Sequence, residues 1–518
     1  MPYDYKPFPF VTPPGLTAPE PRHPVVIVGA GPIGLAAALE LANHGVRSVV
    51  LDDNNVVSVG SRAICWSKRS LEILDRLGVG AACVEKGVVW KVGRTYHRDR
   101  EVFNFDLLPE PGHRMPAFVN LQQYYVEEYL AAKALASDLI DLRFKNRVTG
   151  VSQAADGARV EIETPEGSYT LEAGYVLACD GAKSPIRAML GLEFQGVLFE
   201  ERFLIADIEM EADFPSERRF WFEPEFHQGQ SALLHKQPDN IYRIDLQLGW
   251  DTDPAEENRP EKIIPRIEKV VGHGRFKLDW HSIYTFQCRR LDRFVHGRVI
   301  FVGDSAHVVS PFGARGGNGG LQDVDALGWR LAAVVKGAAP AAILQRYDLE
   351  RCHGADENIL NSSRSTRFMS PSDGAERWFR DATLALAGHA EFARPMVNSG
   401  RLSVPCVYPL SDAPDVAGMP LSARPGAVAP DAPLGNDWLL SGLGGEMVVL
   451  AIGKPAPEGL VVRAVEVAVM PEVKARYLGD ADSALYLIRP DQIVAARWER
   501  AEDGVIDALV AAIWEGRA

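Results

Sequence analysis

The stretch VVIVGAGPIGLAAALELANHGVRSVVLDD, residues 25–53, decides the fold of this chain. It begins with a short β-branched run at 25–28 and continues through a glycine-rich turn into a segment of helical composition at 33–43. Gly45 suits the end of that helix, and a second β-branched run follows at 49–51. This order predicts a βαβ unit with parallel strands and a right-handed crossover.

The glycine-rich turn has the pattern G-x-G-x-x-G at Gly29, Gly31 and Gly34. The first glycine permits a tight turn, the second lets a pyrophosphate approach the helix N-terminus, and the third allows the helix to pack closely on the strand. Asp52 ends the second strand, where a carboxylate can accept hydrogen bonds from a ribose hydroxyl. These residues predict a dinucleotide site but leave FAD and NAD both open.

Two later segments each follow an apolar, strand-like run. The first is CDGAKSPIR at 179–187, and the second is GDSAH at 303–307, which leads into PFGARGGNGG at 311–320. The glycine run precedes a predicted helix that begins near Leu321. Such a run offers backbone N–H groups and a helix dipole to an anionic or electron-rich group.

Composition excludes several classes of protein. Hydrophobic residues make up 47% of the 518 residues and charged residues 24%, as in ordinary globular proteins. The net charge of −14 leaves no surplus of cations for phosphates, so we expect no nucleic-acid partner. The chain has neither a long apolar run nor a secretory signal, which predicts no membrane partner and a cytoplasmic location. Six scattered cysteines without C-x-x-C predict no metal site.

The pattern along the chain predicts four parts, with an overall α/β (α+β) organisation. Residues 1–23 are Pro-rich and predict an extended N-terminal arm. A nucleotide-binding domain is expected over 24–190 and 290–395, and an antiparallel-sheet substrate domain over 191–289, where strand-like segments alternate. Residues 400–518 are expected to form a small C-terminal α/β domain, which begins with a Pro/Gly/Ala-rich linker or long loop at roughly 405–435.

The three glycine- and aspartate-bearing segments, in this order, resemble the flavoprotein aromatic hydroxylases, the FAD monooxygenases typified by para-hydroxybenzoate and phenol hydroxylases. The stretch SVGSRAICWSKRSLEIL at 58–74 looks most like the branch with 3-(3-hydroxyphenyl)propionate hydroxylases. The resemblance implies a Rossmann-type FAD-binding domain, an antiparallel-sheet substrate domain and a C-terminal thioredoxin-like domain. That last domain lacks C-x-x-C, so we expect it to be redox-inert.

The resemblance also implies a reaction. FAD would carry the oxidative step, with NADPH or NADH as co-substrate. A small phenolic substrate would be hydroxylated with O₂ through a C4a-hydroperoxyflavin. We expect the residues from about 400 onward to be structural and to shape a homodimer. The identity of the phenol, the ring position attacked and the choice of nicotinamide nucleotide stay open.

Candidate cofactor residues follow from the matching motifs. The residues implied in FAD binding are Gly29, Gly31 and Gly34 for the pyrophosphate, Asp52 for the ribose, Arg62 and Gln123 nearer the flavin, Asp180 for both nucleotides, Asp304 for the ribityl chain, and Gly317 and Asn318 at the pyrimidine carbonyl. His307 belongs to the same motif and is predicted to be a packing residue.

The substrate pocket is expected between the antiparallel sheet and the flavin. The candidate catalytic residues are Pro311, at the reactive edge of the flavin, and Tyr284, Arg243 and His235, while Trp221 and Phe222 are candidate lining residues. Phenol hydroxylases carry Ala-Asp-Gly where this chain has Ala63-Ile64-Cys65, so their acid near the phenol is absent. The catalytic base therefore stays open.

Three other classes of flavoprotein fit parts of the sequence. A flavin-dependent halogenase usually carries W-x-W-x-I-P, and this chain has no W-x-W. A flavin disulfide reductase needs C-x-x-C, which is absent. A non-catalytic FAD-binding protein would not need the segments at 303–320 that surround the reactive end of the flavin.

Overall fold

The predicted βαβ unit forms the centre of the first sheet. β1 (His23–Val28), α1 (Pro32–Asn43) and β2 (Ser48–Asp52) follow one another, and β1 pairs parallel with both β2 and β11 (Gly167–Ala178). The order across this sheet is β17-β18-β11-β1-β2-β8, and β9 and β10 extend it as an antiparallel addition to β11. The computed structural model describes residues 3–249, 252–371, 374–397, 402–410 and 412–517. The other strands are β8 (Ile140–Phe144), β9 (Arg147–Gln153), β10 (Ala158–Thr164), β17 (Val295–His296) and β18 (Val299–Phe301).

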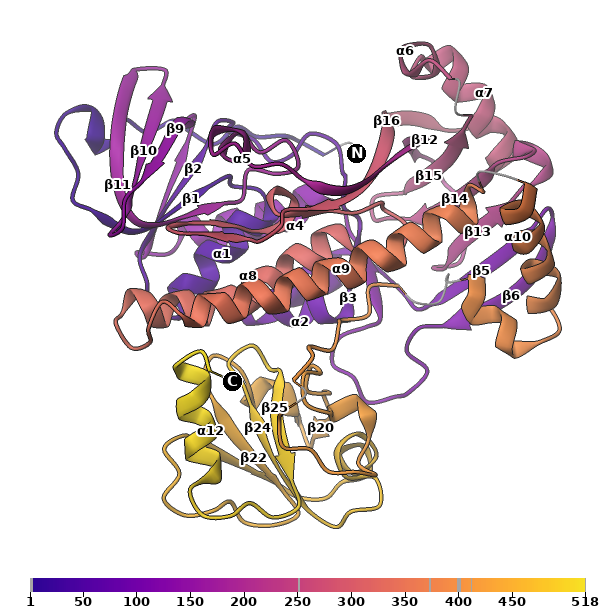
Figure 1. The fold of residues 1–518 in the computed structure, drawn as a ribbon. Helices are drawn as coiled ribbons and strands as arrows, with labels where there is room; N and C mark the ends of the chain where they lie inside the picture. Colours follow the sequence, from indigo (N-terminus) through magenta and orange to yellow (C-terminus); the bar gives the residue numbers. More distant parts are fainter. Residues whose placement is uncertain (1–2, 250–251, 372–373, 398–401, 411, 518) are drawn as a thin grey trace.

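Helices cover one face of this sheet (Figure 1). The close approach of α1 to α8 is set by Gly328, because a Cβ atom there would lie 2.3 Å from Cγ of Glu40. The helices of this part are α2 (Lys68–Arg76), α3 (Gly80–Lys86), α4 (Gln123–Leu135), α5 (Pro185–Met189), α8 (Gly316–Val335) and α9 (Ile343–Met369), whereas α10 (Gly374–Ala387) lies beside the second sheet (Figure 1). Within the described residues, no helix is both long enough and apolar enough to cross a membrane.

The second sheet has eight strands in the order β19-β16-β12-β15-β14-β13-β5-β6. Their bounds are β5 (Val92–His97), β6 (Arg100–Asp106), β12 (Gln195–Glu209), β13 (Arg218–Phe222), β14 (Ser231–Lys236), β15 (Ile241–Leu248), β16 (Lys277–Arg290) and β19 (His307–Val308). The range 191–289 expected for this sheet is therefore incomplete, since β5 and β6 come from inside the range assigned to the nucleotide domain. β5 pairs parallel with β13 across more than a hundred residues, a long-range pairing that local sequence patterns do not reveal. Helices α6 (Pro254–Glu257) and α7 (Pro260–Val271) lie at the outer end of this sheet (Figure 1).

A small sheet in the order β3-β7-β4 joins the two larger parts. Its strands are β3 (Cys65–Ser67), β4 (Val88–Trp90) and β7 (Phe118–Asn120). The N-terminal arm packs along the body, where Phe8 stacks on Phe144 with ring centroids 4.4 Å apart. Tyr5 Oη accepts a hydrogen bond from Gly60 N at 3.1 Å, so the arm reaches the loop that precedes β3.

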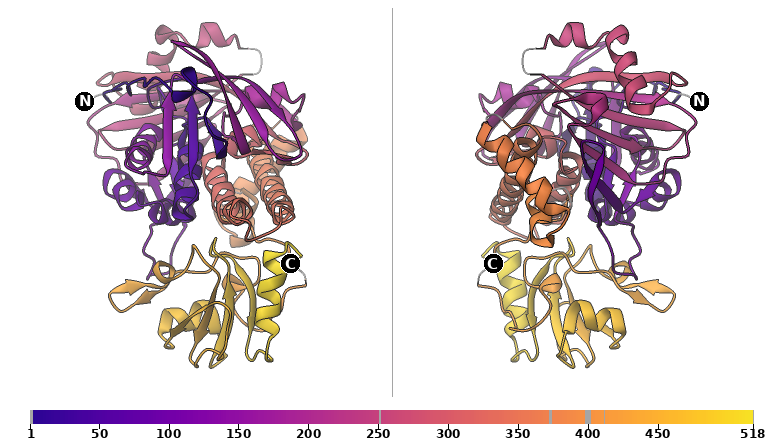
Figure 2. Two further views of the ribbon diagram at one scale, coloured as in Figure 1. Left: turned by 90° about the vertical axis from the view of Figure 1, so that its left-hand side faces the viewer. Right: turned by 90° about the vertical axis from the view of Figure 1, so that its right-hand side faces the viewer.

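The C-terminal unit lies below the helices (Figures 1 and 2). Its sheet has the order β23-β22-β24-β25, with β22 parallel to β23 and antiparallel to β24. The elements are β22 (Val448–Ile452), β23 (Arg463–Val467), α11 (Pro471–Val473), β24 (Ala484–Ile488), β25 (Val494–Trp498) and α12 (Val505–Trp514), preceded by the short strands β20 (Pro433–Leu434) and β21 (Asp437–Trp438). The thioredoxin-like description of this unit stays a prediction.

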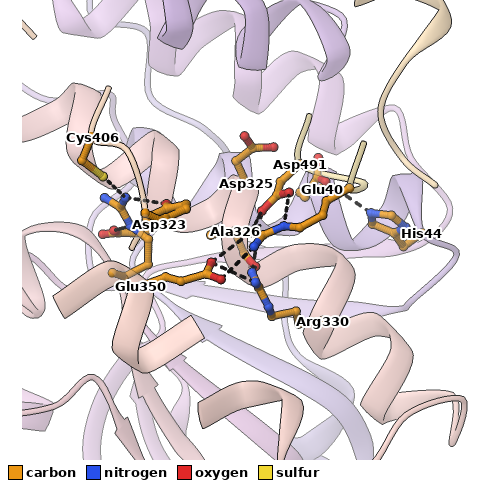
Figure 3. Close-up of polar contacts among 12 residues, drawn as sticks. Glu40, His44, Asp323, Asp325, Ala326, Arg330, Glu350, Cys406 and Asp491 are labelled. Carbon is orange, nitrogen blue, oxygen red and sulfur yellow. Dashed lines mark hydrogen bonds and ion pairs between the residues drawn. The ribbon is translucent and has the colours of Figure 1, made fainter. Parts of the chain in front are cut away.

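A buried charge network joins this unit to the helices. Arg489 donates to both carboxylate oxygens of Glu350 on α9, at 2.7 and 2.9 Å, and also binds Asp491. Arg330 on α8 donates to Glu350 at 2.9 Å (Figure 3). Because each buried charge has partners of opposite sign, the network fixes how the C-terminal unit docks. In the same region burial raises the pKa of the Cys406 thiol to about 11, so this cysteine stays protonated and unreactive.

Candidate functional site

One cavity of about 1080 Å³ runs from the glycine-rich turn to the face of the second sheet. The residues proposed from the sequence that line it are Gly29, Gly31, Asp52, Arg62, Gln123, Asp180, His235, Arg243, Tyr284, Asp304, Pro311, Gly317 and Asn318. The structure thus brings the nucleotide motif and the substrate-sheet candidates to a single space, although they come from both large sheets.

The three glycines of the G-x-G-x-x-G turn differ in what surrounds their Cβ positions. Gly29 has a φ of +104°, and a Cβ atom there would lie 2.4 Å from the carbonyl oxygen of Cys179. At Gly34 a Cβ atom would lie 1.9 Å from the carbonyl oxygen of Gly29, so this glycine packs behind the turn. Gly31 has no atom within 4 Å of its Cβ position, and it faces the cavity. Gly29 and Gly34 are therefore required by contacts within the protein, whereas Gly31 leaves space for a ligand.

Asp52 holds the turn in place from the end of β2. Its carboxylate accepts hydrogen bonds from Ala30 N at 2.6 Å and from Asn54 N at 2.8 Å. Burial raises the pKa of Asp52 above its ordinary value even though both backbone bonds favour the ionised form. Because a carboxylate has about four acceptor positions, this group can still receive a ribose hydroxyl on its cavity side.

Asp180 and Asp304 present oxygens that no protein group satisfies. Oδ2 of Asp180 accepts from Ser184 Oγ at 2.8 Å and Ile186 N at 3.1 Å, while its buried Oδ1 has no partner. The Asp304 carboxyl faces the cavity and forms no hydrogen bond within the described chain. Desolvation within the cavity raises the pKa of both carboxyls. Two unsatisfied acceptors at the wall of one cavity fit a ligand rich in hydroxyl donors.

The first turn of α8 supplies backbone donors. The Asn318 side chain is fully engaged: its Oδ1 accepts from Ser67 N at 3.0 Å, and its Nδ2 donates to the carbonyl oxygens of Cys65 and Ala314. These bonds tie the helix start to β3. The N–H groups of Gly317 and Asn318 lie in the first turn, where a helix has no internal acceptors for them, so they are free to bind an electron-rich carbonyl.

Arg243 supports the loop that carries Arg62. It pairs with Asp207 through Nε at 2.9 Å and Nη2 at 2.7 Å, and it donates to the carbonyl oxygens of Ser61 and Arg62. Gln123 is also engaged with protein, accepting from Ala63 N at 3.1 Å and donating to Glu127 at 2.7 Å. Both residues line the cavity, and their polar atoms hold its wall in shape.

The remaining candidates divide between the cavity and the core. Tyr284 and His235 line the cavity. Trp221 faces away from it and stacks on Tyr96 with centroids 5.3 Å apart. Phe222 is buried against Phe368, so neither aromatic residue belongs to the cavity wall. Strand alternation explains why Trp221 is absent from the cavity wall, because its side chain lies on the opposite face of β13 from those of the adjacent residues.

His307 is a buried packing residue, as predicted. Its Nε2 lies 2.6 Å from Oδ2 of Asp323, and its ring stacks on Phe294. Asp323 also accepts from Gly303 N at 3.0 Å, and therefore anchors the loop that carries Asp304.

Sequence reasoning missed three residues of the site. Arg218 and Asp245 line the cavity from the second sheet, and Asp323 supports it from α8. The sequence could have indicated Asp245, because it lies two residues after Arg243 on one predicted strand and therefore shares its face. No sequence pattern indicated Asp323, since an acid within a helix is usually exposed.

The glycine turn gives a first testable prediction. Gly31→Ala places its methyl group in open space, so we expect the apoprotein to change in stability by less than about 1 kcal/mol. The same methyl group projects toward the pyrophosphate position, so we expect flavin affinity to fall by about tenfold or more. Thermal unfolding of the apoprotein and fluorescence titration with FAD measure the two effects.

Gly34→Ala is the matched comparison. Its methyl group clashes with backbone rather than ligand, so the apoprotein itself should be destabilised. Equal FAD affinity for wild type and the Gly31→Ala variant would contradict the assignment of the turn.

Comparison with known proteins identifies the family. The family model described as the FAD binding domain matches residues 22–362. This chain therefore belongs to that family of FAD-binding proteins, and FAD is its cofactor.

Two named relatives illustrate the similarity. The chain is 28% identical over 358 residues to a 3-(3-hydroxy-phenyl)propionate/3-hydroxycinnamic acid hydroxylase of Mycolicibacterium smegmatis, a match that covers 69% of this chain and 63% of that relative. The chain thus spans just under two thirds of that hydroxylase. It is 28% identical over 518 residues to the 12-dehydrotetracycline 5-monooxygenase/anhydrotetracycline 6-monooxygenase of Streptomyces rimosus, which covers 94% of this chain and 98% of the relative.

Solved structures share the fold over nearly the whole chain. The anhydrotetracycline hydroxylase OxyS of Streptomyces rimosus is similar with a TM-score of 0.74 and 27% identity, covering 96% of this chain and 99% of OxyS. The flavin-dependent monooxygenase PieE, solved with FAD and substrate, has a TM-score of 0.80 at 20% identity, covering 96% of this chain and 100% of PieE. The latter likeness concerns the fold alone.

Proposed function

We propose that this chain is an FAD-dependent monooxygenase that hydroxylates a phenolic ring with NAD(P)H and O₂. One observation carries the proposal: a single cavity joins the glycine-rich nucleotide turn to an aromatic-lined space under the second sheet. The names of the relatives support the same class of reaction, since three of those matched over more than nine-tenths of this chain are named monooxygenases.

The residues of the cavity suit each part of FAD. Gly31 and the α1 N-terminus would receive the pyrophosphate, and Asp52 the adenosine ribose. Asp304 would accept from ribityl hydroxyls, and the free N–H groups of Gly317 and Asn318 would bind the pyrimidine carbonyl. When bound by these residues, FAD would supply the redox chemistry for hydride uptake from NAD(P)H and for oxygen activation.

Aromatic side chains line the substrate end of the cavity. Phe203, Phe286 and Phe312 form a three-way cluster with centroids 4.8–5.1 Å apart, and two of them line the cavity. Tyr284 and Pro311 complete this wall. An apolar enclosure protects a reactive oxygen species from loss as hydrogen peroxide and holds an aromatic ring by packing.

Arg243 is proposed as a positioning residue. Its bonds to Asp207 and to the Ser61 and Arg62 carbonyls orient the loop, so that the Arg62 side chain faces the cavity. His235 and Pro311 remain proposals for contact with substrate and flavin. The homodimer and the cytoplasmic location stay predictions from the sequence.

The test uses purified protein. We expect about one non-covalent FAD per chain, and NAD(P)H oxidation that rises on addition of the right phenol from a panel of phenolic acids and polycyclic phenols, with a product 16 mass units heavier. A colourless protein that does not take up FAD would contradict the proposal.

A further inference from the structure

The N-terminal arm contacts the loop that joins β2 to β3, residues 53–64, and this β2–β3 loop forms one wall of the cavity. We propose that the contact controls the retention of FAD: Tyr5 and Phe8, in the tip of the arm at residues 3–10, are positioning residues that hold the loop in place beside the cofactor and slow its release. The inference goes beyond the proposed function, because it concerns how FAD is kept and not which ring is hydroxylated.

The β2–β3 loop depends on partners elsewhere in the chain for its shape. It contains no helix or strand, so its backbone groups have no helical or ladder partners of their own. Asn54, Val56, Ser58 and Arg62 of this loop line the cavity together with the glycine-rich turn. Within the described chain no residue of the arm lines the cavity, so the arm acts on FAD through the loop.

Phe8 holds the first part of the loop. Its N–H donates to the carbonyl oxygen of Asn55 at 2.7 Å, and Nδ2 of Asn55 donates to the carbonyl oxygen of Phe8 at 3.0 Å. The Phe8 ring stacks on Phe144, with centroids 4.4 Å apart and an angle of 3° between the ring planes. Phe144 is the register partner of Asp52, the last residue of β2. The stack therefore fixes the arm beside the point at which the loop leaves the first sheet.

Tyr5 holds the later part of the loop. The N–H of the buried Gly60 donates to Tyr5 Oη at 3.1 Å. Gly60 has a φ of +74°, and a Cβ atom there would lie 2.2 Å from Nε1 of Trp280, so the loop packs closely against β16 at this point. The Tyr5 ring contacts the rings of Tyr3 and Tyr124, with centroids 4.9 and 5.7 Å apart. These ring contacts orient the Tyr5 hydroxyl toward the loop.

The two arm contacts lie on either side of a contact between the loop and α4. Ser58 donates to the Glu127 carboxylate through its backbone N–H at 2.5 Å and through Oγ at 2.7 Å. Asn55 precedes Ser58 and Gly60 follows it, so the arm holds the loop on both sides of this anchor. Loss of either arm contact leaves Ser58 joined to α4 but frees the adjoining part of the cavity wall. We therefore expect the loop to open locally more often, and FAD to leave faster.

The base of the arm is anchored separately from its tip. The Glu20 carboxylate accepts from Nη1 and Nη2 of Arg143 at 2.8 and 2.7 Å, and the two side chains are only 8% and 5% exposed. A Cβ atom at Gly15 would lie 2.3 Å from the ring of Tyr169, so the arm also passes close to β11. Substitutions in the tip therefore free the tip without detaching the whole arm.

The experiment measures how fast FAD leaves the holoenzyme. Protein loaded with one FAD per chain is diluted, and the change of flavin fluorescence gives the dissociation rate. Tyr5→Phe keeps the ring and removes the acceptor of Gly60 N, so we expect release to become about three- to tenfold faster. Phe8→Ala removes the stack on Phe144 and should make release about tenfold or more faster. Because only loaded protein reports release, any misfolded chain does not contribute.

Tyr3→Phe is the matched control. It is the same substitution in the same arm, but Tyr3 Oη donates to Glu128 on α4, at 2.9 Å, and not to the loop. We expect its release rate to stay within about twofold of that of wild type. Thermal unfolding of the apoprotein should shift by a similar small amount in Tyr3→Phe and Tyr5→Phe, since each loses one hydrogen bond. A difference in release rate between these two variants therefore reports the loop contact and not overall stability.

Phe8→Tyr tests the stack by a conservative change. This variant keeps an aromatic ring against Phe144, so its release rate should return to within about twofold of that of wild type. Release as slow as wild type in Tyr5→Phe or in Phe8→Ala would overturn the proposal. Equal acceleration in Tyr3→Phe and Tyr5→Phe, or release from Phe8→Tyr as fast as from Phe8→Ala, would overturn it as well.

The proposed function fails separately. If the tip variants release FAD faster while the loaded wild type hydroxylates no phenol, the arm keeps its role and the monooxygenase falls. If phenols are hydroxylated while the tip variants release FAD at the wild-type rate, the monooxygenase stands and the role of the arm falls. A wild-type chain that takes up no FAD would overturn both.

Discussion

Asp323→Ala is expected to lower the free energy of unfolding by about 3–5 kcal/mol. Its carboxylate is fully buried and joins three groups: His307 Nε2 at 2.6 Å, Gly303 N at 3.0 Å and Arg351 Nε at 2.6 Å. The substitution leaves Arg351 as a buried cation with one carboxylate fewer, and it leaves a buried N–H without an acceptor. The loop that carries Asp304 also loses its anchor, so FAD binding should weaken.

Denaturant unfolding of the apoprotein measures this loss, and Asp356→Ala is the control. Asp356 forms a two-contact ion pair with Arg290 at 2.6 and 2.9 Å, but its side chain is 58% exposed. An exposed pair contributes about 0–1 kcal/mol, so the control should unfold almost as wild type does. Similar losses in the two variants would show that burial of the Asp323 network is not what stabilises this region.

The pH dependence of stability follows from the same carboxylate. Burial opposes its ionisation, but His307 and Arg351 hold the pKa of Asp323 below its ordinary value. Its stabilisation is therefore present above the unfolded pKa of about 3.9 and is lost as the pH falls through the lower folded value. Wild type should accordingly lose its advantage over Asp323→Ala in that acidic range.

Asp304→Ala is expected to weaken FAD binding by about 10- to 150-fold, which corresponds to the roughly 1.5–3 kcal/mol of a hydrogen bond to a charged group. The apoprotein should keep its stability, because the Asp304 carboxyl is exposed to the cavity and has no hydrogen-bond partner within the described chain. The variant thus separates ligand binding from folding, in contrast to Asp323→Ala.

Fluorescence titration with FAD and thermal unfolding of the apoprotein measure the two quantities. Asp304→Asn retains the size and one acceptor, so its affinity should lie between those of wild type and the alanine variant. A large loss of apoprotein stability in Asp304→Ala, with FAD affinity unchanged, would contradict the role given to this carboxyl.

Local sequence signals predicted the nucleotide half of the site. The spacing of Gly29, Gly31 and Gly34 reflects backbone contacts within one βαβ unit, so the turn could be derived from neighbouring residues alone. The segments around Asp180 and Asp304 follow strands of the same sheet and carry similar local signals. Resemblance to a family then assigned their order along FAD.

The substrate half depends on contacts that are distant in sequence. β5 joins β13 by long-range pairing, and no local pattern indicates which strand accepts it. Arg243 and Asp245 share a strand face, yet only the structure shows that Arg243 is paired with Asp207 and that Asp245 is not. Trp221 has the composition of a pocket residue but lies on the opposite face of its strand from Arg218.

Incorporation of labelled oxygen tests the central claim most directly. The FAD-loaded protein, NAD(P)H and the phenol panel would be incubated under ¹⁸O₂, and the products measured by mass spectrometry. The account predicts that at least one phenol gains a single ¹⁸O atom, with NAD(P)H consumed in proportion. NAD(P)H oxidation that yields only hydrogen peroxide with every phenol, or product oxygen that derives from water, would contradict it.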